Sequence, residues 1–146
     1  DRSQPALDGA MESARLNGVE SRCAVRRQEA FGALEALRDA GERFEIVVVD
    51  PPAFAKSRKE APAALRAYRK LARLAAALVA PGGILFAASC SHNVAPEPFG
   101  EAVARGLADA NRTGRILRQA GAGPDHPLHP MLPESAYLKS LTLAVD

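Results

Sequence analysis

The chain has 146 residues, of which 47% are hydrophobic and 25% charged, and its formal net charge is +2 at pH 7. This composition predicts one folded domain, while the near balance of charges argues only weakly for a polyanionic partner. No apolar run approaches the roughly 20 residues that span a bilayer, and Cys23 and Cys90 lack the spacing of a zinc site or a disulfide framework, so we predict a soluble, cytoplasmic protein without a metal.

The first fifty residues predict two helices, a short strand and a buried strand. Ser3 can cap a helix of about 13 residues, which ends at Asn17-Gly18. Cys23 and its neighbours form a candidate strand, and residues 30–37 have the apolar spacing of a second helix. The nearly continuous apolar run from Phe44 to Val49 predicts a strand that helices cover on both faces.

The rest of the chain continues this alternation. We predict a helix over residues 62–80, a strand over 84–88, a helix over 97–111, a strand over 115–118, a loop over 120–133 and a last strand over 137–145. Alternating strands and helices are typical of an α/β fold with a parallel sheet. Because the last strand follows another strand without a helix between them, we predict a mostly parallel sheet with an antiparallel C-terminal strand.

The stretch VVVDPPAFAKSRKE, residues 47–60, ends the first buried strand on an acid and two prolines. Asp50 and Cys90 each follow a predicted strand, and the carboxyl ends of adjacent parallel strands open into one crevice. Pro51 and Pro52 have no N–H group, so their turn is stiff and its carbonyls are free to bind a base that carries an exocyclic amine. Phe54 offers a ring for stacking on that base. The alternative is that the prolines only end a strand and Phe54 fills the core.

A basic run follows the two prolines. It contains seven cations and one acid, Glu60; the cations are Lys56, Arg58, Lys59, Arg66, Arg69, Lys70 and Arg73. Such a run is usually a solvated helix face, but beside a base pocket it favours contact with the phosphates of a nucleic acid, with Lys56 nearest to the proposed base.

Cys90 has two interpretations: a small buried hydrophobe, or an accessible nucleophile at the catalytic edge of the sheet. Its flanking serines and its position after an apolar strand favour the nucleophile, whereas Cys23 has neither feature and is predicted to be structural. Lys139 is ambiguous between a phosphate contact and a surface charge.

Four segments together resemble one known family. They are DRSQPALDGAMESARLNG, DPPAFAKSRK, SCSHNV and DHPLHPMLPESAYLKSL, in this order along the chain. The order is similar to that of class I methyltransferases dependent on S-adenosylmethionine, and most closely to ribosomal-RNA (cytosine-5) methyltransferases with an N-terminal PUA domain. The resemblance implies a Rossmann-like sheet without its first strands, in which residues 1–146 are the C-terminal portion of one catalytic domain, without the glycine-rich first motif and the PUA domain.

The resemblance also implies roles for individual residues. Asp1 corresponds to the acid that binds the ribose hydroxyls of the cofactor, and Glu29 to an acidic position near its adenine. Asp50, with Pro51 and Pro52, corresponds to the motif that faces the target base beside the cofactor, and Cys90 to the nucleophile. In this chemistry a thiolate adds to C6 of cytosine, so that C5 can take the methyl group, while Asp50 shares a proton with N3.

Two alternatives and two consequences remain open. The chain could belong to an enzyme that methylates an exocyclic amine of a base, with Cys90 only packing, or it could be a non-catalytic RNA-binding fragment. Without the first strands, a strand edge would be open, and we expect that this chain either self-associates there or was cut from a longer protein. We also expect the isolated chain to bind S-adenosylmethionine weakly or not at all and to be inactive, because full activity should require the missing part.

Overall fold

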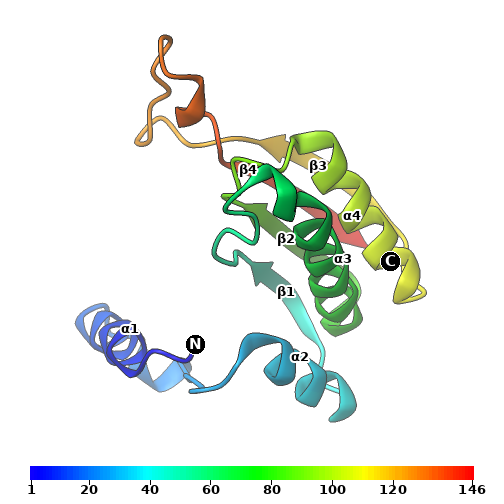
Figure 1. Ribbon diagram of the computed structural model, residues 1–146. Helices are drawn as coiled ribbons and strands as arrows, with labels where there is room; N and C mark the ends of the chain where they lie inside the picture. The colour runs from blue at the N-terminus through cyan, green and yellow to red at the C-terminus, as the bar shows by residue number, and fades with distance from the viewer.

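The computed structural model describes residues 1–146, which form four helices, four strands and three short 3₁₀ turns (Figure 1). The helices are α1 (Gln4–Leu16), α2 (Ala30–Asp39), α3 (Ala61–Leu78) and α4 (Pro96–Asp109). The strands are β1 (Phe44–Val49), β2 (Val79–Ser89), β3 (Gly114–Ala120) and β4 (Lys139–Val145), and the 3₁₀ turns are η1 (Glu20–Arg22), η2 (Arg58–Glu60) and η3 (Pro133–Ser135). No helix has both the length and the apolar character needed to cross a membrane.

The four strands form one mixed sheet in the order β1-β2-β4-β3. The α/β class is confirmed, but the prediction of a mostly parallel sheet was wrong. Only β1 and β2 pair in parallel, with Ile46 opposite Ile84, whereas β4 pairs antiparallel with both β2 and β3. The reason is the place of β4: β3 runs in the same direction as β1 and β2, but β4 lies between β2 and β3 and makes both of its pairings antiparallel.

Local signals determine several element ends. Ser3 caps α1, with its side chain accepting a hydrogen bond from the Ala6 N–H at 3.4 Å, as predicted. The Pro81-Gly82-Gly83 segment lies between the helix predicted over residues 62–80 and the strand predicted over 84–88. In the structure it is instead part of β2. Gly83 allows this because a Cβ atom there would lie 2.7 Å from the Glu45 carbonyl oxygen of β1. A glycine therefore lets the two parallel strands approach.

The hydrophobic core lies on one face of the sheet, under α3 and α4. Leu78 of α3, Leu85 of β2 and Phe99 of α4 are almost fully buried there. The opposite face is open in this chain, since Ile46 and Val48 of β1 remain 65% and 62% exposed. The prediction that helices cover both faces of β1 was therefore wrong for this chain: α3 and α4 pack on one face, and α1 lies away from the sheet (Figure 1).

The predicted strand at Cys23 is also absent. The backbone at Cys23 is extended, but residues 23–27 form no ladder and Cys23 is exposed. This segment is joined instead to the N-terminus, where Asp1 donates its amino group to the Arg26 carbonyl at 3.1 Å and accepts from the Gln28 N–H at 2.9 Å. Two hydrogen bonds to one residue hold the extended segment without making it part of the sheet.

Candidate functional site

The site is built where β1 and β2 end next to each other. Val49 of β1 pairs with Ala87 of β2, so the residues that follow both strands emerge at the same edge of the sheet. The Cys90 sulfur lies 3.8 Å from the Pro51 carbonyl oxygen, within reach of a weak S–H hydrogen bond. The structure thus brings Cys90 beside the Asp50-Pro51-Pro52 turn, as the sequence predicted. Asp50 is exposed and Cys90 is partly buried.

Buried hydroxyl groups connect the DPPAF loop, which follows β1, with the segment that follows β2. The Ser91 Oγ accepts hydrogen bonds from the Phe54 N–H at 3.0 Å and the Ala55 N–H at 3.4 Å. The Tyr68 hydroxyl lies 2.9 Å from Ser91 Oγ and accepts from Ser89 Oγ at 2.8 Å. All three hydroxyl-bearing residues are at least 98% buried. We name Tyr68, Ser89 and Ser91 the hydroxyl cluster; sequence reasoning missed it.

Removing the Tyr68 hydroxyl should destabilise the fold. Tyr68→Phe leaves the hydroxyls of Ser89 and Ser91 buried with fewer partners, so the free energy of unfolding should fall by about 1–3 kcal/mol. Urea denaturation measures this change. The matched control is Tyr137→Phe, at the other of the two tyrosines, whose exposed hydroxyl bonds His126. An equal loss of stability in both variants would contradict a special contribution of the hydroxyl cluster.

Phe54 is half-buried and lies in a row of aromatic rings. Its ring centroid is 4.8 Å from that of Tyr68 and 6.3 Å from that of Phe31. These contacts support the interpretation that Phe54 fills the core. Stacking on a base stays a prediction, and it would involve only the part of the ring that remains exposed. Pro51 is partly buried and Pro52 exposed at the surface next to it.

A cleft of about 730 Å³ lies on the other side of Asp50. Asp1 and Asp50 both line it, and the Asp1 carboxylate also accepts a hydrogen bond from the Ser3 N–H at 2.7 Å. Its volume and mixed lining are typical of a cofactor site. A carboxylate can bind sugar hydroxyls and an apolar wall can take a purine ring, so these residues fit S-adenosylmethionine. The apolar wall includes Ala30, Ala33, Leu34, Leu37, Phe44 and Val48.

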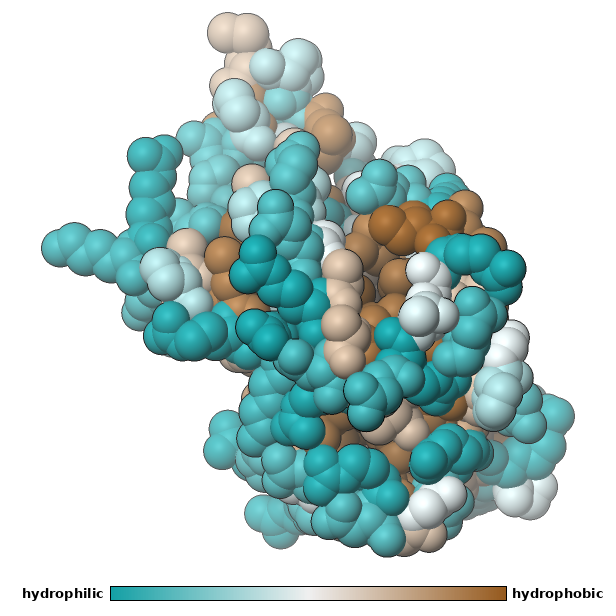
Figure 2. Space-filling model, turned by 90° about the vertical axis from the view of Figure 1, so that its right-hand side faces the viewer, coloured by the Kyte–Doolittle hydropathy of each residue, from teal (hydrophilic) through white to brown (hydrophobic).

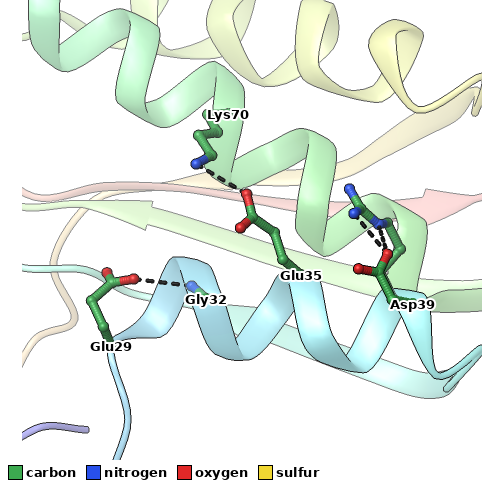
Figure 3. Close-up of polar contacts among 6 residues, drawn as sticks. Glu29, Gly32, Glu35, Asp39 and Lys70 are labelled. Atoms are coloured by element: carbon green, nitrogen blue, oxygen red, sulfur yellow. Dashed lines mark hydrogen bonds and ion pairs between the residues drawn. The ribbon is translucent and has the colours of Figure 1, made fainter.

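Glu29, the third predicted cofactor residue, does not line this cleft, although its neighbours Gln28 and Ala30 do. Its carboxylate caps α2 by accepting a hydrogen bond from the Gly32 N–H at 3.0 Å (Figure 3). Hydrogen bonds from the backbone of Gly32 and Phe31 lower the pKa of Glu29 below its usual value. Glu29 therefore determines where α2 begins, and its role near the adenine stays a prediction.

Two of the seven cations of the basic run are paired within the chain. Arg69 binds Asp109 through two hydrogen bonds of 2.6 and 2.7 Å, which lower the pKa of Asp109. Lys70 lies 3.1 Å from Glu35 of α2 (Figure 3). Its ammonium also lies 5.0 Å from the centre of the Phe31 ring. These pairs tie α3 to its neighbouring helices. The surface on the side of α4 is largely hydrophilic (Figure 2), and Lys56, Arg58 and Lys59 are exposed beside the DPPAF loop.

Lys139 was predicted to be a phosphate contact or a surface charge, and the structure shows neither. Only 8% of the residue is exposed. Its ammonium donates hydrogen bonds to the carbonyls of Ser91 at 2.7 Å and Val94 at 2.6 Å. Burial lowers the pKa of Lys139, and the negative charge that Cys90 can carry opposes this shift.

Comparison with known proteins indicates the family of this chain. A family model described as S-adenosylmethionine-dependent methyltransferase matches residues 1–140. Ribosomal RNA large subunit methyltransferase I of Aeromonas salmonicida is 40% identical over 144 residues, which are 98% of this chain and 36% of that protein. The protein of the same name from Erwinia tasmaniensis is 36% identical over 146 residues. The chain thus spans about 36% of the length of these curated relatives.

Solved structures share the fold. A putative methyltransferase, SMU.776, in complex with SAH aligns with a TM-score of 0.75 at 16% identity, over 99% of this chain and 37% of that one. A putative SAM-dependent methyltransferase from Streptococcus mutans aligns with a TM-score of 0.65 at 20% identity, over 80% of this chain and 29% of that one. The fold, the cleft and the family model lead to one conclusion. This chain belongs to the S-adenosylmethionine-dependent methyltransferase family, whose cofactor is S-adenosylmethionine.

Proposed function

We propose that this chain is the C-terminal portion of the catalytic domain of an enzyme that methylates C5 of a cytosine in ribosomal RNA. The observation that carries the proposal is the approach of the Cys90 sulfur to the carbonyl of Pro51, which lines the cofactor cleft together with its neighbour Asp50. The names of the relatives support ribosomal RNA as the substrate, and we propose the cytoplasm, where ribosomal RNA is found, as the location.

The residues of the site suit a covalent mechanism. The bound cofactor supplies an electrophilic methyl group. The Cys90 thiolate adds to C6 of the cytosine, and the electron pair of the C5–C6 double bond becomes available at C5 to form the bond to the methyl carbon. The S–CH3 bond of the cofactor would break in that step, with S-adenosylhomocysteine as the leaving group. Asp50 shares a proton with N3 and so offsets the charge that develops on the ring. After methylation, C5 loses its proton to water, the C5–C6 double bond forms again, and the C6–S bond breaks to return the Cys90 thiolate.

The surroundings of these two residues suit a base that has left its stack. A base inside a helix cannot reach Cys90, so the target nucleotide must rotate out toward the loop. Pro51 and Pro52 then border the base. The part of the Phe54 ring that remains exposed lies against the flat face of the base. Lys56, Arg58 and Lys59 lie where the flanking phosphates would pass.

The test is the identity of the product. The longer protein that carries this chain is incubated with unmodified ribosomal RNA and S-adenosylmethionine, and the RNA is digested and analysed by mass spectrometry. We expect 5-methylcytidine. A methyl group on an exocyclic amine of another base would support amine methylation at the same loop instead. Binding of RNA without any transfer would support the non-catalytic alternative, and either result would overturn the proposal.

We also propose that isolated copies of this chain associate through β1. This strand is at the edge of the sheet. Its apolar residues Ile46 and Val48 lie on the sheet face that no helix covers, and both are exposed. Unpaired edge strands of this kind pair with other chains, and a charge on the strand opposes this. Ile46→Lys should therefore convert the associated chain into a monomer in sedimentation velocity. Leu16→Lys, at an exposed leucine of α1, is the control; a monomeric wild-type chain would sink the proposal.

A further inference from the structure

We propose that Lys139 is a positioning residue for Cys90. The proposal rests on the proposed function, since it concerns the same nucleophile. Cys90 is followed by the turn Ser91–Val94, which the Val94 N–H closes by donating to the Ser91 carbonyl at 3.1 Å. Lys139 donates to the carbonyls at both ends of this turn, at 2.7 and 2.6 Å. One side chain from β4 thus holds the backbone that directly follows the nucleophile.

The charge of Lys139 is unusual for a purely structural contact. The ammonium is buried and has no carboxylate partner, because its two hydrogen bonds go to carbonyl groups. Burying a cation is costly, and a negative charge on Cys90, the residue before the turn, would offset part of that cost. The two carbonyls therefore receive strong, charge-assisted hydrogen bonds, which fix the turn that directly follows Cys90.

The turn is also fastened from the opposite side. Ser91 Oγ binds the backbone of Phe54, and the Asn93 side chain donates to the Ala55 carbonyl at 3.3 Å. Lys139 lies opposite Ser89 in the β2–β4 pairing, so it reaches the turn from the sheet, while the DPPAF loop reaches it from β1. With Lys139 in place, Cys90 is held at a defined distance from the turn that bears Asp50.

The geometry leads to a kinetic expectation. A nucleophile that is misplaced by about 1 Å can lose about 100-fold in rate, although substrate binding is little changed. Lys139→Met in the longer protein keeps the length of the apolar stem and removes both hydrogen bonds. We expect kcat for RNA methylation to fall by about 100-fold, with KM for the cofactor and the RNA nearly unchanged. Lys139→Arg, which keeps the charge and the donors, should recover part of the lost kcat.

Two controls separate positioning from folding. Arg115→Met removes an exposed cation of β3 that pairs with Asp146 and should leave kcat unchanged. Hydrogen exchange in Lys139→Met should show lost protection at the Val94 amide with unchanged protection in β2. If Lys139→Met is unfolded, Lys139→Gln, whose neutral donors are weaker and on a shorter stem, is measured in its place. We expect a smaller fall in kcat with KM unchanged, and a wild-type kcat would overturn the inference.

The outcomes distinguish this inference from the proposed function. If Cys90→Ala is inactive but folded Lys139→Met keeps wild-type kcat, Lys139 has no positioning role and the covalent mechanism stands. If Lys139→Met loses kcat and KM rises in parallel, or β2 loses protection as well, the effect is structural and the inference is overturned. If Cys90→Ala remains active, the proposed function itself fails.

Discussion

Replacing Cys90 with alanine in the longer protein that carries this chain should lower the rate of methyl transfer to ribosomal RNA by about 10⁴-fold or more. Losses of this size are typical when the nucleophile of a covalent mechanism is removed. The fold should remain, because Cys90 is only partly buried and its sulfur makes one weak contact, with the Pro51 carbonyl. Transfer of a labelled methyl group, measured with saturating cofactor, determines the rate.

The matched control for this variant is Cys23→Ala. Cys23 is the only other cysteine and lies exposed in the extended segment after η1. This variant should keep the wild-type rate. If Cys90→Ala also methylates RNA at nearly the wild-type rate, the covalent mechanism is excluded, and methylation of an exocyclic amine becomes the better explanation of the DPPAF loop.

Gly106→Val should destabilise the fold by about 3 kcal/mol, in the upper range for an overpacked core. Gly106 is the point where α4 crosses α3. A Cβ atom there would lie 2.6 Å from the Ala72 Cβ, 2.7 Å from the Arg69 carbonyl oxygen and 2.9 Å from the Arg73 nitrogen. Two of these three atoms are helix backbone, which cannot turn aside as a flexible side chain can. The midpoint and slope of urea denaturation give the change in stability.

The control for Gly106 is on the same helix. Gly100→Ala adds a Cβ that has no atom within 4 Å. Because alanine is the better helix former, this variant should be neutral or more stable by up to about 1 kcal/mol. A stable Gly106→Val protein would show that α4 can move away from α3 at little cost. In that case the close packing would not determine the position of Tyr68, which lies on the same stretch of α3.

Elements with strong local signals were predictable to the residue or nearly so. The ends of α1 follow from the Ser3 cap and the Asn17-Gly18 pair, and β1 has the predicted bounds of Phe44–Val49. The strand order was not predictable in the same way, because it depends on which strand β4 meets in space. The alternation in β4 indicated a strand, but no local feature shows that it pairs on both sides.

The convergence of Asp50 and Cys90 on one edge of the sheet could be predicted because it follows from two adjacent parallel strands. The hydroxyl cluster could not, since Tyr68 and Ser89 lie 21 positions apart on a helix and a strand. Lys139 did have a signal. It alternates with Leu141, Leu143 and Val145, which point into the core, so its side chain had to point inward as well. A charged residue at an inward position of an alternating strand is the signal that marks Lys139 as buried.

The place of β4 between β2 and β3 has a consequence for how the protein is made. β3 has no other strand beside it, so it cannot join the sheet before residues 139–145 are available. A chain emerging from the ribosome can form α3, α4 and the β1–β2 pair early, because these elements are neighbours in sequence. Residues 139–145 must therefore enter an internal position of the sheet, and a chain that stopped before residue 139 would leave β3 without any partner strand, while β2 would keep its pairing with β1.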